Sequence, residues 1–163
     1  MKHVLTIAAF AGLVLAVGAY GATRGGHRAN VERQADLYQI DAIEKTWHKA
    51  ASLKNLDLFM SIWAPNATAT LAGQTVTGKT AIRAVFAKAG PFQAKNHWVS
   101  DTPAYKIRAT VNGAKGTLYF ECHYIDVDTG KVAAVVGAHQ EVQKISGKWL
   151  ITNLAASTVT LKP

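Results

Sequence analysis

Cysteine is almost absent from this 163-residue sequence, because Cys122 is the only one. An intramolecular disulfide is therefore impossible, and a folded domain must be held together by its apolar core. No cysteine lies near residue 20, which excludes lipid attachment to a cysteine at a processed N-terminus. No cysteine-enzyme signature surrounds Cys122, so we interpret it as a small buried apolar residue in a strand.

Acidic residues are also scarce, with 10 Asp and Glu against 18 Lys and Arg and a formal net charge of +8. Apart from Lys2, the basic residues are scattered from Arg24 to Lys162, without a run and without interleaved aromatic residues. A nucleic-acid-binding protein shows a basic stripe or a recognisable motif. We therefore expect no nucleic-acid partner, and a cationic surface with some attraction to anionic cell envelopes.

Motifs for cofactors and metals are missing as well. The segment 126–130 resembles the opening of a calcium loop, but the later glycine and glutamate are absent, so we interpret it as a hairpin turn. Gly73 and Gly78 form no phosphate loop. The sequence has no zinc, dinucleotide or serine-hydrolase signature, and we predict neither a cofactor nor a bound metal.

A long apolar run is present at the N-terminus, from Val4 to Val17. Small residues at positions 19 and 21 match those read by a signal peptidase, which predicts a signal peptide over residues 1–21. The protein would then be secreted or periplasmic. An uncleaved membrane anchor is the alternative, because residues 4–22 can just span a bilayer.

The remainder of the chain has the composition of one globular domain. Hydrophobic residues make up 49% of the sequence and charged residues 17%, which argues against disorder. Residues 22–30 are small and polar, and we predict a linker over residues 22–34. The folded domain should therefore cover residues 35–163.

Apolar spacing predicts three helices in the first half of this domain. A helix over residues 31–52 should carry one apolar stripe, because apolar residues recur there at helical spacing. A short second helix should run from Asp57, as its N-cap, to Trp63. A third should begin near residue 78 and end by residue 91. The stripe of the first helix consists of Ile40, Ile43, Trp47 and Ala50.

From residue 96 onward, apolar residues alternate with a period of two and turn residues recur at regular spacing. This pattern is typical of an antiparallel sheet built from hairpins. Two of the strands exceed ten residues, which implies that the sheet bends. The sequence therefore predicts an α+β fold, with three N-terminal helices packed in the concave face of a strongly curved antiparallel sheet. The expected strands are 96–101, 105–111, 116–126, 132–145 and 149–161.

The alternation also predicts which strand residues face the hollow of this cone-shaped barrel. Over residues 118–125 the even positions are the more apolar, so Phe120 and Tyr124 should face inward. Glu121 and His123 should face water or a partner subunit. Gln140 is a polar residue on the inner face of the next strand, where a ligand, a water or a neighbouring residue could supply its hydrogen bonds.

Two titratable residues bracket the expected strand 96–101. His97 and Asp101 lie four residues apart, so they should share one face at a distance of about 13 Å and could approach opposite ends of one ligand. Histidine can transfer protons near neutral pH, although a structural hydrogen bond is the alternative role. Trp98 between them either fills the core or forms a pocket wall.

The order of elements from Asp36 to Thr160 resembles the SnoaL-like branch of the nuclear-transport-factor-2-like superfamily. The resemblance implies an α+β cone, often dimeric through the outer face of the sheet. Members include ketosteroid isomerases, dehydratases, polyketide cyclases and epoxide hydrolases, as well as binding and assembly domains without a reaction. The segments that carry the resemblance are 50–67, 78–82, 97–101, the turn before Gly116, and 147–151.

In enzymes of this family, an Asp or His in the cone acts as acid or base, often beside a tyrosine. The resemblance places His97 where several relatives carry a pocket histidine, whereas Asp101 falls where asparagine is common. An isomerase-type pair of carboxylates is missing from the inner face at 118–124, which offers Cys122 and Tyr124 instead.

Three hypotheses follow, and the sequence leaves open whether any reaction is catalysed. The first is an exported domain that binds a small, largely apolar molecule in its cone, with His97 as the polar anchor. The second is a cofactor-free lyase or isomerase that uses His97 and Asp101. The third is a homodimerisation or interaction module that acts through the outer sheet face. The expected lining consists of Trp63, Trp98, Phe120, Tyr124, Gln140 and Asn153.

Overall fold

The computed structural model describes residues 12–160, and the side chains from residue 26 onward. Contacts along the chain divide it into two units, Met1–Ala35 and Asp36–Pro163. Within the described residues, no helix is both long and apolar enough to cross a membrane. Residues 1–11 of the predicted signal peptide lie outside the described residues.

Helix α1 (Gly12–Ser52) begins well before residue 31, where the apolar stripe predicted its start. The segment 22–34, predicted as a linker, is helical in the structure. No proline interrupts it, and an ion pair of 2.9 Å between Arg28 and Glu32 joins successive turns. Small polar residues alone therefore do not mark the end of a helix here.

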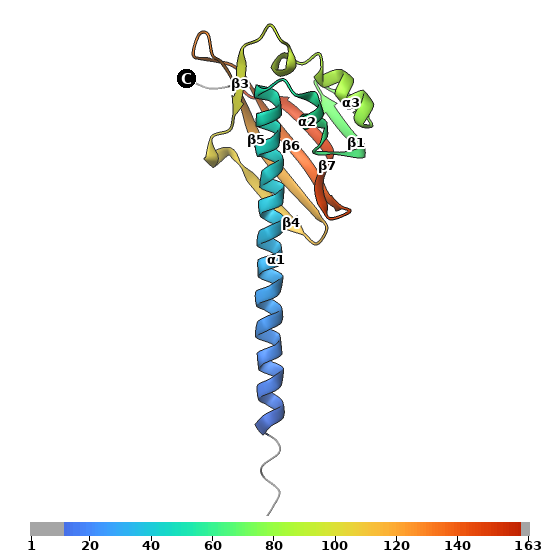
Figure 1. Ribbon diagram of the computed structural model, residues 1–163, viewed down its shortest axis with the longest axis vertical. Helices are drawn as coiled ribbons and strands as arrows, with labels where there is room; N and C mark the ends of the chain where they lie inside the picture. The colour runs from blue at the N-terminus through green and yellow to red at the C-terminus, as the bar shows by residue number, and fades with distance from the viewer. Residues whose placement is uncertain (1–11, 161–163) are drawn as a thin grey trace, which may run out of the picture. The chain divides into compact units, whose positions relative to one another are not determined.

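The second unit adds two short helices, two 3₁₀ turns and one sheet. The helices are α2 (Leu56–Met60) and α3 (Lys79–Phe86), and the turns are η1 (Gly90–Phe92) and η2 (Ala104–Lys106). The strands are β1 (Trp63–Leu71), β2 (Gln74–Thr77), β3 (Trp98–Asp101), β4 (Arg108–Asn112), β5 (Lys115–Asp126), β6 (Lys131–Ile145) and β7 (Lys148–Thr158). The strands expected from residue 96 onward are all present, with ends shifted by a few residues (Figure 1).

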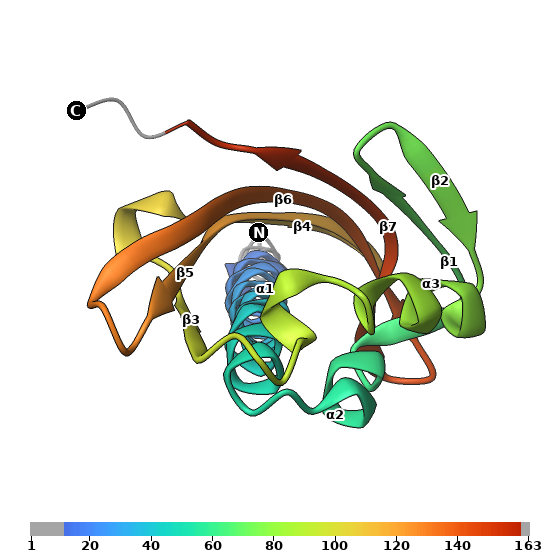
Figure 2. The same cartoon turned by 90° about the horizontal axis from the view of Figure 1, so that it is seen from above.

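The strands form one seven-stranded sheet in the order β2-β1-β7-β6-β5-β3, with β4 also paired to β5. Figure 2 shows the sheet curled, without closing, around α2, α3 and the second-unit part of α1. The predicted α+β cone is thus confirmed. One detail differs, because β1 and β7 pair in parallel whereas the other pairs are antiparallel. No hairpin connects these two strands, so no tight turn fixes their relative direction.

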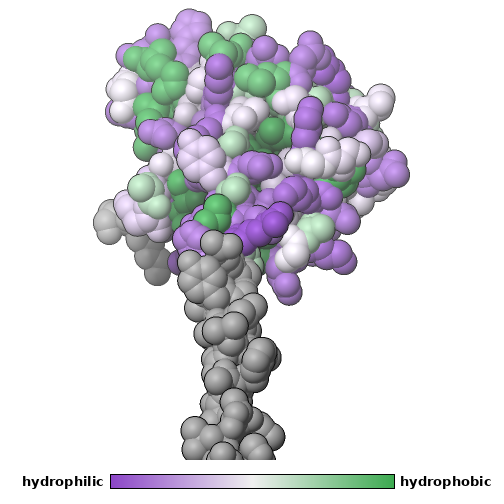
Figure 3. Space-filling model, turned by 60° about the horizontal axis from the view of Figure 1, so that its bottom comes forward, coloured by the Kyte–Doolittle hydropathy of each residue, from purple (hydrophilic) through white to green (hydrophobic). Residues whose placement is uncertain are grey.

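The core is centred on Trp47 of α1, whose ring contacts aromatic rings from every layer. Phe59 of α2 lies at a centroid distance of 4.6 Å, and Phe86 of α3 at 5.7 Å. Trp63 of β1 and Phe120 of β5 lie at 6.2 and 5.6 Å. This aromatic cluster fixes the helices against the sheet. On the face in Figure 3, by contrast, hydrophilic residues separate the apolar ones.

The start of α2 corrects the predicted capping residue. Asn55 caps the helix, because its side-chain oxygen accepts the N–H of Leu58 at 2.9 Å. Asp57 lies inside the helix and pairs with Arg83 of α3 at 2.7 Å. The helix ends at Met60, so that Trp63 begins β1 instead of closing the helix.

Burial along β5 agrees with the predicted alternation except at Glu121. The even positions Phe120 and Tyr124 are buried on the inner side. Glu121 was expected to face water, but it is only 5% exposed. The η2 turn covers this part of the outer face, and Lys106 donates to the Glu121 carboxylate at 3.0 Å. His123, also expected outside, is half-buried beside Glu121.

Candidate functional site

An apolar cavity of about 470 Å³ lies between the inner face of the sheet and the segment from α3 to η1. Helix α1 contributes Trp47 to its wall, and the segment after α3 contributes residues 88–91. From the sheet, the cavity is lined by Leu71, Trp98, Tyr124, Ala134, Val136 and Ala156. Apolar walls with few polar groups are typical of small-molecule sites.

Small residues beside large rings create this space. Tyr124 lies opposite Ala134 in the β5–β6 pairing, and its ring is 6.2 Å from that of Trp98. Gly90 permits the position of the indole, because a Cβ atom at residue 90 would lie 2.7 Å from Trp98 Cζ3. The two aromatic walls are therefore positioned by the small size of their neighbours.

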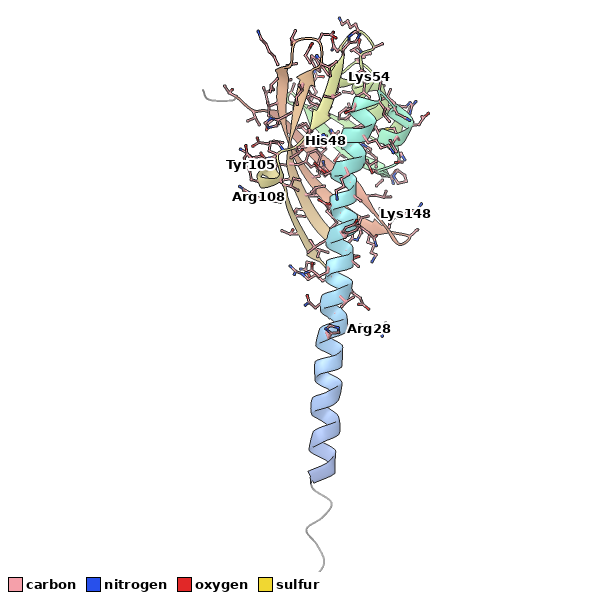
Figure 4. All side chains as sticks on the ribbon, turned by 60° about the vertical axis from the view of Figure 1, so that its left-hand side comes forward. Arg28, His48, Lys54, Tyr105, Arg108 and Lys148 are labelled. Atoms are coloured by element: carbon pink, nitrogen blue, oxygen red, sulfur yellow. The ribbon has the colours of Figure 1, made fainter. Side chains whose placement is uncertain are left out.

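Lys54 follows the end of α1, as Figure 4 shows, and it links this end of the helix to the rim of the cavity. Its Nζ donates to the backbone oxygen of Pro91 at 3.0 Å and to that of Trp98 at 3.2 Å. Burial lowers the pKa of Lys54. This ammonium group therefore connects η1 and β3, the two segments that border the cavity on this side.

Tyr124 brings a polar group to the apolar wall. Burial raises its pKa well above the usual range, and the neighbouring thiol of Cys122 adds to this effect. Burial likewise raises the pKa of Cys122, so the thiol stays protonated and is a poor nucleophile. The indole N–H of Trp47 is buried and has no hydrogen-bond partner among the described residues. Two of the lining residues, Trp47 and Tyr124, thus carry neutral hydrogen-bond donors.

A row of polar side chains lies beside Tyr124. His48, which Figure 4 shows on α1, places its Nδ1 atom 2.6 Å from Ser100 Oγ. Its Nε2 atom lies 2.5 Å from Thr102 Oγ1 and 3.1 Å from a carboxylate oxygen of Glu44. Glu44 and His48 are 5% and 7% exposed. This arrangement can hold a proton at a defined ring nitrogen.

Comparison with known proteins identifies the fold family. Residues 32–155 match the profile of the SnoaL-like domain. The chain belongs to the SnoaL-like domain family. No curated protein matches the sequence.

Solved structures agree with this SnoaL-like assignment. An NTF2-like protein from Novosphingobium aromaticivorans has a TM-score of 0.70 and 13% identity, over 81% of this chain and 87% of that one. A candidate dehydratase of the NTF2-like family from Streptomyces avermitilis has a TM-score of 0.63 and 13% identity, over 78% and 99%. A candidate ketosteroid isomerase from Shewanella frigidimarina has a TM-score of 0.58 and 16% identity, over 71% and 92%. At these identities the likeness shows the fold alone.

The residues expected to line the cone of this SnoaL-like domain lie in four different places. Trp98 and Tyr124 line the cavity. Trp63 and Phe120 are fully buried in the aromatic cluster. Gln140 is buried on the inner face of β6, where its amide has no partner within the part of the chain described.

Asn153, the sixth expected lining residue, is exposed on β7. It pairs with Glu141 of β6, which is also exposed, whereas the neighbouring pair of Gln140 and Leu154 is buried. Because successive strand residues point to opposite faces, Asn153 lies on the outer face of the sheet.

His97 and Asp101 lie on the exposed side of β3. The strand begins at Trp98, and its alternation turns Trp98 and Ser100 inward. His97 pairs instead with Asp128 of the β5–β6 turn at 2.7 Å. The Asp101 carboxylate accepts the N–H of Thr102 at 2.8 Å. The structure therefore does not bring the expected acid–base pair to the cavity.

The apolar stripe predicted for the first helix left out Glu44 and His48. Both lie beside the apolar stripe, one helical turn apart, and both are buried. The spacing of Glu44, His48 and Ala51 repeats the three-and-four pattern of the stripe itself. This spacing was the sequence signal that the buried face of α1 is wider than the apolar stripe and includes Glu44 and His48.

Proposed function

We propose that this SnoaL-like domain binds a small, largely apolar molecule in the cavity between α3 and the sheet. The observation that carries this proposal is the cavity itself, at about 470 Å³ and with mainly apolar walls. Small-molecule sites have volumes of roughly 300–1,000 Å³. Tyr124 and Trp47 would supply hydrogen bonds to an acceptor atom on the bound molecule.

The similar structures support the same class of ligand by analogy. Two of them are a candidate dehydratase and a candidate ketosteroid isomerase, names that refer to reactions of small organic molecules. This support rests on the shared fold, which hosts several activities. The hypothesis of proton transfer by His97 gains no support from the geometry, because its side chain is 60% exposed and points away from the cavity.

Filling the cavity tests the proposal. Ala134→Phe should place a ring in the space opposite Tyr124, and we expect the affinity for the apolar dye Nile red to fall at least about tenfold, since roughly 1.4 kcal/mol is lost for each factor of ten. Protein purified from its own host should also lose the small molecule that native mass spectrometry detects on the unaltered chain.

Ala133→Phe is the matched control, because Ala133 is exposed on the same strand. This variant should keep both the dye affinity and the retained molecule, and circular dichroism should show that both variants fold. Equal binding by the two variants would place the ligand elsewhere and refute the proposal.

We also propose that the protein is exported and that it self-associates. The apolar segment at residues 4–17 supports a signal peptide, with an uncleaved anchor as the alternative. The outer sheet face carries His139, whose ring stacks on Tyr119 at 4.4 Å, and the exposed Glu141. A second copy of the chain would find both aromatic and charged groups there.

A further inference from the structure

Glu44, His48 and Ser100 form a connected row that the proposed binding function does not use. The imidazole of His48 bridges the other two residues, at 2.6 Å to Ser100 Oγ and 3.1 Å to the Glu44 carboxylate. Glu44 and His48 come from adjacent turns of α1, and Ser100 comes from the middle of β3. A hydroxyl, an imidazole and a carboxylate in this order are the parts of a serine nucleophile with its base and orienting group.

The hydrogen-bond partners of His48 determine which ring nitrogen carries the proton. The Thr102 hydroxyl donates to the backbone oxygen of Glu121 at 2.9 Å, so toward His48 Nε2 it can only accept. The Glu44 carboxylate lies 3.1 Å from the same nitrogen, and an ionised carboxylate can only accept. Nε2 therefore carries the proton, and Nδ1 presents its lone pair to the hydroxyl of Ser100. A general base requires this tautomer.

The row ends next to the apolar cavity. Ser100 follows the cavity residue Trp98 by two positions on the inner face, and it lies opposite the cavity residue Tyr124 in the β3–β5 pairing. The Trp47 N–H, unpartnered in residues 26–160, and the Tyr124 hydroxyl are neutral donors on two residues that line the cavity. Acyl transfer needs such donors, because negative charge develops on the carbonyl oxygen.

We infer that Ser100 is a nucleophile for acyl transfer from small apolar esters, with His48 as its general base and Glu44 as a positioning residue. This inference rests on the proposed function, since the cavity would hold the acyl group. Ser100 Oγ bonds to the ester carbonyl carbon while His48 Nδ1 takes the hydroxyl proton. The bond from that carbon to the alcohol oxygen breaks, and the alcohol leaves with the proton from His48.

Water completes the reaction by the same route. It attacks the carbonyl carbon of the acyl-serine and gives a proton to His48 Nδ1. The bond from this carbon to Ser100 Oγ breaks, the carboxylic acid is released, and Ser100 regains its proton from His48. The alternative role of the row is structural, as a tether between α1 and β3, and it predicts no covalent adduct.

A fluorophosphonate probe and p-nitrophenyl butyrate test the inference on the full chain. We expect peptide mass spectrometry to find the probe on Ser100, and Ser100→Ala to lose both the labelling and the ester hydrolysis above the buffer rate. His48→Gln should slow hydrolysis by about 100-fold or more, the usual contribution of a general base. Glu44→Gln should lower kcat with little change in KM and should shift the pH profile.

Ser157→Ala is the matched control, because Ser157 is an exposed serine on β7, and it should keep the wild-type rate. Absence of probe from Ser100 in the wild-type protein would overturn the inference, even if Ser100→Ala failed to fold. Nile red binding separates the two proposals. Dye binding without labelling removes the nucleophile and leaves the binding function, whereas loss of both removes both.

Discussion

At the scale of single residues, Asp36 shows how one carboxylate can hold two elements together. Its Oδ1 atom accepts from Lys144 Nζ at 2.7 Å and from the indole N–H of Trp149 at 2.9 Å. Both hydrogen bonds lower the pKa of Asp36. Their stabilisation is therefore present above pH 3.8, the usual value, and is lost as the pH falls through the lower folded-state pKa.

Replacing this carboxylate by an amide should weaken the fold. We expect Asp36→Asn to lower the free energy of unfolding by about 1–2 kcal/mol, because hydrogen bonds to a charged group are lost. Urea unfolding at pH 7 measures the change. Asp41→Asn is the control, since Asp41 pairs with the exposed Lys45 and should cost roughly 0.5 kcal/mol or less. Equal losses in the two variants would contradict this account.

At the scale of elements, turn chemistry made the strands predictable. Gly113, Gly130 and Gly147 all have positive φ, and they close the three hairpins that the sequence indicated. The face of β3 was harder to predict, because its four residues alternate weakly in polarity. The acid–base hypothesis required His97 to face inward, whereas Trp98 is the inward residue in the structure. The pairing with β5 shows this, because it places Ser100, two residues after Trp98, opposite the buried Tyr124.

Lys54 connects η1 and β3, a contact that the alternation of strand residues does not predict. Its removal should loosen the rim of the cavity. Lys54→Met keeps the length of the side chain but leaves the oxygens of Pro91 and Trp98 without this donor. We expect a loss of about 1–3 kcal/mol in unfolding free energy and faster hydrogen exchange at η1. Lys49→Met, at an exposed position on α1, should change neither. Unchanged exchange at η1 in Lys54→Met would show that the rim is held by packing alone.

For the domain as a whole, the sequence was sufficient to predict the SnoaL-like cone and an inner hollow. It did not predict which part of the hollow is filled by side chains and which part remains an open cavity. Trp63 and Phe120 fill one part as core, whereas Trp98 and Tyr124 wall the open part. All four were expected from the sequence to line the hollow. Which of them packs and which borders space depends on contacts between distant segments, which periodicity does not record.

The buried acids at the centre of the domain predict its behaviour in alkali. Cys122 and Tyr124 would titrate near pH 9.0 and 10.0 in an unfolded chain, and burial raises both pKa values in the fold. Above pH 9.0 the unfolded chain therefore releases protons that the folded domain keeps, so stability falls as the pH rises. The slope reaches about 1.4 kcal/mol per pH unit for each group.

Cys122→Val separates the two contributions, because it removes the thiol and keeps an apolar side chain at a fully buried position. Urea midpoints of the wild-type protein should fall from pH 9 to 10, and the variant should be flatter over this interval by up to about 1.4 kcal/mol. Above pH 10 both proteins should lose stability, since Tyr124 remains in both, and the wild type should fall more steeply because it also keeps Cys122. A variant with the wild-type slope between pH 9 and 10 would mean that the folded domain accommodates the Cys122 thiolate, and the centre of the cone would then be less apolar than its burial implies.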